Sequence, residues 1–187
     1  MSSEHAPRYS AEDALKLLVE GNHRYVDTGE HSDRIGEDIR LHTATKGQFP
    51  FAVIITCSDS RVIPTAVFNA GIGDLFVIRS AGNIVDGCTL GSVEYAVEHL
   101  GCRLVVVLGH THCGAIKATL EGPHEGPVAY ITEEIRNHIS PDADEHTACL
   151  QNVENSIRKL TKGLPARGDV RITGAMYDIE KGTVEFL

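Results

Sequence analysis

The sequence has 187 residues, a length that suits one domain with a sizeable core. Its formal net charge of -9 at pH 7 and its lack of basic runs argue against nucleic acid or an anionic membrane as a partner, because both require concentrated positive charge. No apolar stretch reaches about 18 residues and residues 1–10 lack the apolar middle of a secretory signal, so we expect one soluble, cytoplasmic domain over residues 1–187.

The amino-terminal half alternates helical and strand patterns. Ser10 and Asp13 form a capping-box-like start, and the apolar stripe that follows has helical spacing, which predicts an amino-terminal helical arm, with residues 1–9 disordered or part of it. Residues 51–56 are continuously apolar and rich in β-branched side chains, as in a strand buried on both faces. A turn at 71–74 precedes a second predicted strand over 75–79, a loop over 81–83 and a helix over 89–100.

The carboxyl-terminal half repeats this alternation. Residues 104–108 predict a third buried strand, which ends at Gly109 and His110. Apolar residues then recur at helical spacing over 128–139 and over 150–160, and residues 170–187 predict a closing hairpin broken at Lys181 and Gly182. The fold class that we predict is α/β, with a mostly parallel central β-sheet flanked by helices.

Two short motifs follow the first and third predicted strands. Cys57 comes directly after residues 51–56, and His110, His112 and Cys113 come directly after residues 104–108. Parallel sheets place ligand sites beyond the carboxyl ends of their strands, so the two motifs are expected to meet there. Two thiolates and one imidazole leave the fourth position of a tetrahedral zinc ion open, as in catalytic zinc sites. The alternative is that these are buried, inert cysteines and a satisfied histidine, and spacing alone does not choose between His110 and His112.

The five cysteines also bear on the compartment. An odd number, with two at predicted strand ends, favours a reducing compartment with metal-binding or reactive thiols over a disulfide framework. Cys88, Cys102 and Cys149 have no partner at metal-ligand spacing, and we interpret them as packing or surface thiols. This supports the cytoplasmic prediction.

The motif Cys57-x-Asp59-x-Arg61 together with His110-x-x-Cys113 resembles the β-class carbonic anhydrases. The chain has no Trp, which points within that class to the plant-like branch rather than to the branch with an allosteric bicarbonate pocket. The likeness extends over most of the chain from about Ala11 onward. Further matching segments are Gly71-x-Gly73-Asp74, Arg79-x-Ala81-Gly82-Asn83, Glu94-Tyr95-Ala96-Val97 and Gly174-Ala175-x-Tyr177-Asp178.

The resemblance implies reversible hydration of carbon dioxide to bicarbonate and a proton by a zinc-bound hydroxide. It implies one zinc ion per subunit held by Cys57, His110 and Cys113, and a dyad of Asp59 and Arg61 that orients the hydroxide. It also implies a homodimer, which in some cases pairs further into a tetramer, with some pocket residues contributed across the dimer. The residues expected to form the substrate pocket are Gln48, Phe76, Ala81, Tyr95 and Gly114.

Several alternatives remain open at this stage. A relative that hydrolyses carbonyl sulfide or carbon disulfide would share the ligand residues, and a non-catalytic zinc-binding regulatory protein would share the fold. Asp59 and Arg61 could form a simple turn salt bridge, or Asp59 could leave Arg61 and bind the zinc itself in a closed form. His112 could be an exposed loop histidine or a proton carrier.

Overall fold

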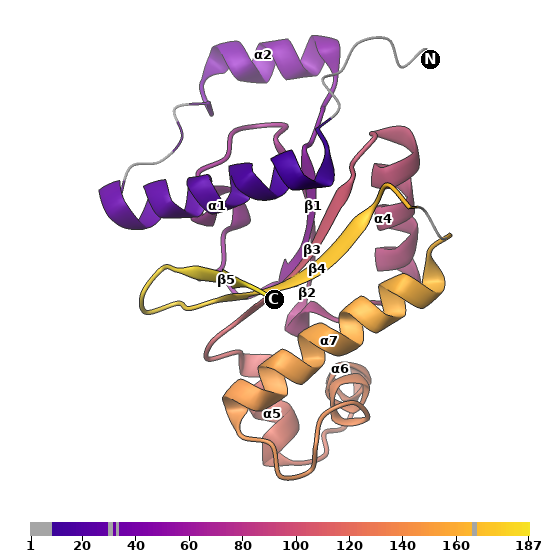
Figure 1. The fold of residues 1–187 in the computed structure, drawn as a ribbon. Helices are drawn as coiled ribbons and strands as arrows, with labels where there is room; N and C mark the ends of the chain where they lie inside the picture. Colours follow the sequence, from indigo (N-terminus) through magenta and orange to yellow (C-terminus); the bar gives the residue numbers. More distant parts are fainter. Residues whose placement is uncertain (1–8, 30–31, 33, 166–167) are drawn as a thin grey trace.

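The structure is a computed structural model that describes residues 9–29, 32, 34–165 and 168–187 (Figure 1). Of the predicted disordered or arm segment 1–9, residues 1–8 therefore lie outside the described part of the chain. The elements, in chain order, are α1 (Ala11–Thr28), α2 (Glu37–Lys46), β1 (Ala52–Cys57), α3 (Pro64–Val67), β2 (Leu75–Ser80), the 3-10 turn η1 (Ala81–Asn83), α4 (Gly87–His99), β3 (Leu104–His110), α5 (Gly114–Glu121), α6 (Pro127–Arg136), α7 (Glu145–Gly163), β4 (Arg171–Tyr177) and β5 (Val184–Phe186).

The sheet has five strands in the order β2-β1-β3-β4-β5. The first four run parallel, and β5 pairs with β4 antiparallel, so the predicted closing hairpin is confirmed. Every residue of β1 and β3 is buried, which explains why both segments are continuously apolar rather than alternating. The predicted α/β fold with a mostly parallel sheet is therefore confirmed.

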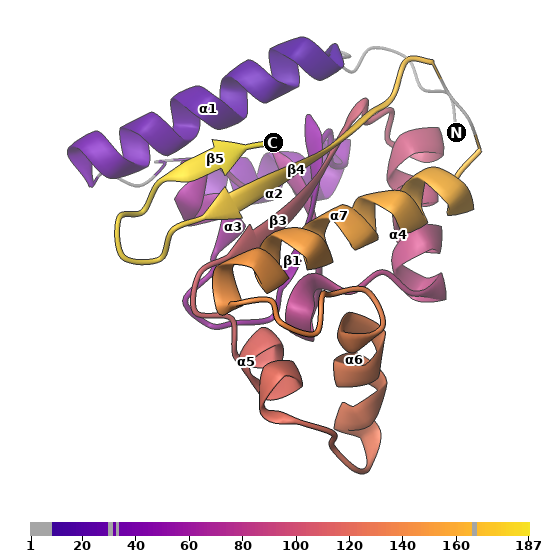
Figure 2. The same ribbon diagram turned by 60° about the horizontal axis from the view of Figure 1, so that its bottom comes forward.

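Helices cover both faces of the sheet, as Figures 1 and 2 show from two directions. Successive residues of a strand point to opposite faces, and each face packs its own apolar cluster. Ile54 and Val106 belong to the cluster that also contains Leu18 of α1, whereas Val53 and Val105 pack with residues of α4 and α7. The strands β1 and β3 are thus packed between two layers of helices. Because the two strands are parallel, their carboxyl ends lie on the same side of the molecule.

Three of the helices begin at side-chain caps. Ser10 accepts a hydrogen bond from the backbone N–H of Asp13, as the capping-box-like pattern predicts. Asp86 caps α4 through the N–H of Thr89, and Asp144 caps α7 through the N–H of Thr147. Each cap satisfies a backbone donor that the first turn of the helix leaves unpaired, and so defines where the helix starts.

Some element boundaries differ from the prediction. β3 ends at His110, as predicted, whereas β2 extends one residue beyond 79 and α7 begins five residues before 150. Three helices were not predicted, namely α2, α3 and α5. The helix α2 has no buried residue, and α3 has only 4 residues, so neither carries an apolar repeat that would reveal it.

None of the described helices is both long enough and apolar enough to span a membrane.

Candidate metal centre and active site

Cys57, His110 and Cys113 meet at the carboxyl edge of the sheet. Cys57 ends β1 and His110 ends β3, and these two strands are parallel neighbours with Thr56 opposite Leu108, so His110 lies one residue beyond the level of Cys57. Cys113 is the N-cap residue of α5, three positions further along the chain, and no side chain caps that helix. The chain crossover that makes β1 and β3 neighbours therefore also assembles this group.

The three side chains are oriented toward a common centre. The sulfur atoms of Cys57 and Cys113 lie 4.0 Å apart, and one ligand atom from each of the three residues lies within 4.8 Å of the others. All three residues are at least 95 % buried, with exposures of 4 %, 1 % and 1 % for Cys57, His110 and Cys113. Within the described ranges, this is the one group of His, Cys, Asp or Glu side chains with such a geometry.

The imidazole of His110 has one nitrogen committed and one free. Its Nδ1 lies 2.8 Å from the carbonyl oxygen of Thr111, which can only accept, so Nδ1 carries the hydrogen. Its Nε2 is buried and has no hydrogen-bond partner among the described residues. A buried nitrogen with an unused lone pair beside two sulfurs fits a metal ligand, because a polar atom left unpaired in the interior is otherwise costly.

The two thiols differ in how readily they ionise. The hydrogen bond from Cys113 lowers the pKa of Cys57 to about 4, and the hydrogen bond to Cys57 raises the pKa of Cys113. Cys57 is further supported by the backbone N–H of Gly82, which donates to its sulfur at 3.3 Å. The lowered pKa of Cys57 favours its thiolate, the form of cysteine that binds metal ions.

Asp59 and Arg61 form a closely bonded pair beside this group. The Asp59 Oδ1 atom accepts from the backbone N–H and from Nε of Arg61, at 3.0 and 2.9 Å, and Oδ2 accepts from Nη2 at 2.8 Å. These bonds hold the pKa of Asp59 well below its usual range. Arg61 also donates to the backbone oxygen of His112 at 2.9 Å, which ties the pair to the segment that carries Cys113. In this structure the carboxylate is thus held by Arg61.

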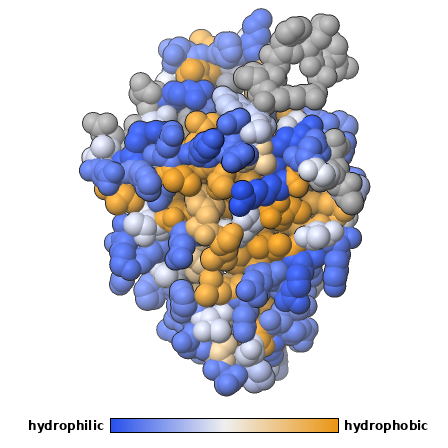
Figure 3. Space-filling model, in the orientation of Figure 1, coloured by the Kyte–Doolittle hydropathy of each residue, from blue (hydrophilic) through white to orange (hydrophobic). Residues whose placement is uncertain are grey.

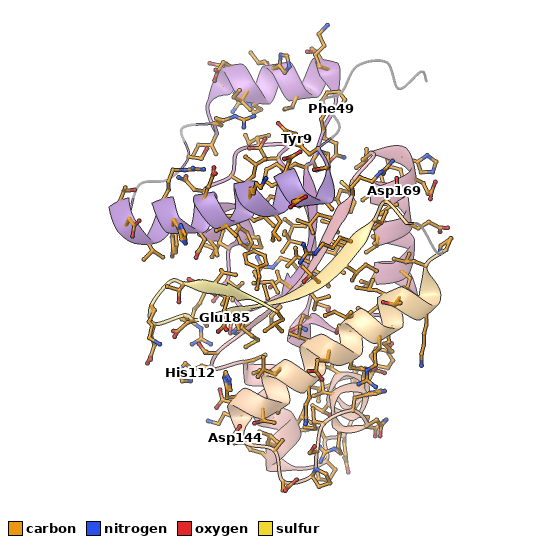
Figure 4. All side chains as sticks on the ribbon, in the orientation of Figure 1. Tyr9, Phe49, His112, Asp144, Asp169 and Glu185 are labelled. Atoms are coloured by element: carbon orange, nitrogen blue, oxygen red, sulfur yellow. The ribbon has the colours of Figure 1, made fainter. Side chains whose placement is uncertain are left out.

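His112 has a different environment from His110. Its φ of 56° turns the backbone into the left-handed region, and its side chain is 55 % exposed. The ring lies 3.7 Å from a carboxylate oxygen of Glu145 and 3.8 Å from one of Glu180. Figure 4 shows His112 close to the amino end of α7, marked by Asp144. The structure therefore brings His110, and not His112, to the two sulfurs.

The predicted pocket residues fall into two groups. Ala81 and Gly114 lie beside the metal ligands, because Ala81 follows Ser80, the β2 partner of Cys57, and Gly114 follows Cys113 directly. Phe76 instead pairs with Val53, four residues before Cys57, which corresponds to roughly 13 Å along the strand. Phe76 therefore lies nearer the opposite edge of the sheet.

Tyr95 and Gln48 belong with Phe76 rather than with the ligands. The ring of Tyr95 packs against Phe76, with 6.3 Å between centroids, and remains 48 % exposed. Gln48 precedes β1 and is exposed at the amino-terminal edge of the sheet. Its neighbour Phe49 lies in Figure 4 at the opposite end of the molecule from His112. One chain alone does not bring these three residues to the cysteines.

Some residues that hold the site were not identified as such from the sequence. Arg79 donates to the carbonyl oxygens of Cys57 and Asp59 at 3.2 and 2.7 Å, and so fixes the turn that carries the dyad. Asn152 of α7 donates to the carbonyl oxygen of Gly82 at 2.7 Å. A buried polar residue within the apolar repeat of a helix is the signal that would have marked Asn152.

The other three cysteines lie outside the metal group. Cys88 is exposed on α4, and Cys102 and Cys149 are buried thiols whose pKa values burial raises to about 11 and about 12. Cys102 donates to the carbonyl oxygen of Pro50 at 3.2 Å, as a packing thiol would. The interpretation of these residues as packing or surface thiols agrees with their positions.

The fold and the site together define a class of protein. It is an α/β protein with a mostly parallel sheet and a candidate metal centre at the carboxyl ends of its strands. The sequence model of the carbonic anhydrase family matches residues 52–184, and the chain belongs to that family. Its fold corresponds to that of the β-class members of the family, since solved β-carbonic anhydrases superpose on it.

Close relatives and solved structures agree with this assignment. The chain is 42 % identical to "Carbonic anhydrase 2" of Mycobacterium tuberculosis over 190 residues, covering 90 % of this chain and 89 % of the relative. It is 37 % identical to a carbonic anhydrase of Mycolicibacterium smegmatis over 191 residues, covering 92 % and 91 %. The structure of the β-carbonic anhydrase CcaA superposes with a TM-score of 0.70 at 30 % identity, covering 92 % of this chain and 98 % of that one. A Coccomyxa β-carbonic anhydrase in complex with acetazolamide superposes with a TM-score of 0.71 at 27 % identity, covering 92 % and 86 %.

Proposed function

We propose that this protein catalyses the reversible hydration of carbon dioxide to bicarbonate and a proton, with one zinc ion per subunit held by Cys57, His110 and Cys113. The observation that carries the proposal is the convergence of these three buried side chains beside a carboxylate that Arg61 holds in place. Membership of the carbonic anhydrase family supports the same reaction. The enzyme is accordingly a lyase.

The donor set fits zinc. Two sulfurs and one imidazole nitrogen are ligands that zinc prefers, and a protein that supplies only three ligands leaves one coordination position open. When bound, the metal supplies a Lewis acid that lowers the pKa of a coordinated water from 15.7 toward about 7. The free Nε2 of His110 and the thiolate of Cys57 are the groups already prepared to hold it.

Asp59 has the features of an orienting acceptor. Its ionised carboxylate can only accept hydrogen bonds, and Oδ2 accepts one from Arg61, which leaves a lone pair available on that oxygen. A hydroxyl that donates to Asp59 has its own lone pairs directed elsewhere, toward a substrate carbon. Arg61 fixes the carboxylate through two parallel bonds, so little reorganisation is needed at the moment of reaction.

A second copy of the chain is proposed to complete the substrate pocket. Gln48, Phe76 and Tyr95 lie away from the metal ligands of their own chain, so they can line a pocket with Ala81 and Gly114 only across an interface. A separate apolar surface lies at the other edge strand, away from β2 and Phe76. Figure 3 shows apolar side chains gathered between α1 and α7, where Figure 1 places β4, β5 and the C-terminus, and Leu187 there is 51 % exposed. Apolar surface of this kind marks interaction sites.

Light scattering coupled to size exclusion tests this assembly. We expect a particle mass of twice the 20.2 kDa of one chain, or four times that mass if dimers pair into tetramers. Tetramers occur in proteins of this fold, since the structure of a Sordaria macrospora β-carbonic anhydrase that superposes with a TM-score of 0.62 is described as tetrameric. A monomeric protein that still hydrates carbon dioxide rapidly would contradict a substrate pocket formed by two chains.

Stopped-flow kinetics test the reaction itself. Purified, zinc-loaded protein should hydrate carbon dioxide rapidly, and should do so faster than it releases sulfide from carbonyl sulfide. Faster sulfide release would assign the protein to the carbonyl sulfide or carbon disulfide hydrolases of the same fold. Stoichiometric zinc without either activity would indicate a non-catalytic zinc-binding protein.

We propose that the protein belongs to the plant-like branch of the family and works in the cytoplasm. The absence of Trp supports the plant-like, non-allosteric branch, in which bicarbonate does not inhibit through a second pocket. None of the five cysteines forms a disulfide, which supports the cytoplasm as the compartment. Inhibition by bicarbonate at an allosteric site, or recovery of the protein outside the cytoplasm on cell fractionation, would contradict these two points respectively.

A further inference from the structure

Helix α7 carries two buried polar side chains that bond to the turn beside the metal group. Asn152 donates through Nδ2 to the carbonyl oxygen of Gly82 at 2.7 Å, and Ser156 donates through Oγ to that of Asn83 at 3.1 Å. Their exposures are only 2 % and 1 %. Four positions separate them, so both point from one face of the helix. We call Asn152 and Ser156 the α7 donor pair.

The turn that receives these bonds has a backbone conformation that needs support. Gly82 and Asn83 have φ values of 68° and 44°, which places two successive residues in the left-handed region. For Asn83 this conformation is uncommon, and strained backbone of this kind persists only when its surroundings hold it. At Gly82 the φ of 68° favours glycine, and a Cβ atom there would lie 2.8 Å from Cδ1 of Ile135 and 3.1 Å from Cβ of Ala115, so a larger residue would be strained and would have to displace Ile135.

The same turn contacts a metal ligand. The backbone N–H of Gly82 donates to the sulfur of Cys57 at 3.3 Å, while the Gly82 carbonyl oxygen accepts from Asn152. Gly82 is therefore anchored on both sides, by the helix and by the thiolate. A hydrogen bond to a thiolate withdraws electron density from the sulfur and fixes its direction, and such outer contacts tune a metal site.

A second contact joins α7 to another ligand. The thiol of Cys149, three residues before Asn152, donates to the backbone oxygen of His110 at 3.4 Å. The helix α7 is thus linked to the ends of both strands that carry ligands. It bonds directly to His110 at the end of β3, and it reaches Cys57 at the end of β1 through the 82–83 turn. Its length of 19 residues and its packing along the sheet make it a rigid support for both contacts.

We infer that the α7 donor pair are positioning residues, which hold the 82–83 turn so that the N–H of Gly82 bonds to the Cys57 thiolate and sets its affinity for the metal. The inference rests on the metal centre proposed above. It assigns to Asn152 and Ser156 a role at the site although neither touches a metal ligand or the substrate.

The chain offers a matched control in Asn155. This residue has the same side chain on the same helix and a similar exposure of 4 %, but its Nδ2 donates to the carboxylate of Glu134 at 3.4 Å instead of to the turn. Asn152→Leu and Asn155→Leu make the same chemical change, since each replaces one buried amide with an apolar side chain. General effects on folding should therefore be shared, and only Asn152→Leu should alter the metal site.

Two readouts separate a positioning role from a structural one. Competition with a chromophoric chelator gives the zinc dissociation constant, and we expect Asn152→Leu to weaken zinc binding by about 10- to 100-fold, as loss of outer contacts does elsewhere. In the cobalt-substituted protein, the thiolate-to-cobalt charge-transfer band should shift in Asn152→Leu. Both properties should be unchanged in Asn155→Leu.

The experiment has clear contrary outcomes. If Asn152→Leu does not fold, judged by the absence of a cooperative melt, Ser156→Ala removes a single hydroxyl and should change both readouts in the same direction by less. The inference alone would be overturned if Asn152→Leu and Ser156→Ala both had the zinc affinity and the cobalt spectrum of Asn155→Leu. Failure of the wild-type protein to bind zinc or cobalt would instead overturn the proposed metal centre.

Discussion

Replacing Cys113 with Ser should abolish stoichiometric zinc binding and slow carbon dioxide hydration by at least about 10³-fold. Cys113 contributes one of the two sulfurs, 4.0 Å from that of Cys57, and a serine hydroxyl does not ionise to replace a thiolate. Without the metal, the pKa of water stays near 15.7 instead of about 7, so the nucleophile is scarce at neutral pH. Metal analysis of the purified protein and stopped-flow hydration measure the two effects.

Cys102→Ser is the matched control for this substitution. Cys102 is also buried, at 1 % exposure, and its thiol donates to the carbonyl oxygen of Pro50, a bond that a serine hydroxyl can also make. Burial raises its pKa to about 11, so it is a neutral thiol at neutral pH and no candidate ligand. This variant should keep both zinc and activity. Full zinc content in Cys113→Ser would refute the proposed ligand set.

Replacing Asp59 with Asn should lower kcat by about 10²- to 10⁴-fold and leave the zinc content unchanged, a range typical of lost proton-transfer and orienting groups. The amide has nearly the same shape, but it lacks the charge that pairs with Arg61 and presents an N–H donor where the reaction needs an acceptor. Because Asp59 is not among the three converging ligands, metal binding should survive. Stopped-flow kinetics and metal analysis on the same preparation test both parts.

Asp74→Asn provides a close control for Asp59→Asn. The carboxylate of Asp74 is 15 % exposed, as is that of Asp59, and it pairs with an arginine, Arg34, at 2.9 Å. It also accepts from a backbone N–H, that of Gly71, at 2.8 Å. Asp74 lies in the turn before β2, at the amino-terminal end of the strands, and Arg34 reaches it from the segment between α1 and α2. An equal loss of activity in Asp74→Asn would show that the Asp59 effect comes from weakening a turn and not from the reaction.

Several features of this protein could be predicted because short-range patterns encode them. The continuous apolar segments around Ile54 and Val106 predict strands buried on both faces, and both lie in the centre of the sheet. The Ser10 cap likewise marks the start of α1. Helices without such a pattern were not predicted. The helix α2 is an example, because it buries no residue and therefore shows no apolar repeat in the sequence.

The candidate site was only partly readable in the same way. The types of the ligand residues and their positions at strand ends point to a metal, but spacing could not distinguish His110 from His112. The structure distinguishes them because His110 still belongs to β3 and is 1 % exposed, whereas His112 follows in a left-handed turn with a side chain that is 55 % exposed. The direction of a side chain depends on the last residues of a strand, which a sequence pattern places only to within a few residues.

The sequence by itself determined the chemistry available to this protein: two cysteines and a histidine at or shortly after strand ends, an aspartate and an arginine next to Cys57 in the chain, and the strands that carry Cys57 and His110. Only the tertiary structure decided that Cys57 and Cys113 lie 4.0 Å apart, that Asp59 rests on Arg61, and that Asn152 supports Gly82. The physical reason is range. Periodicity and capping depend on residues within one or two turns, whereas these contacts depend on which strands become neighbours when the whole sheet buries its apolar faces.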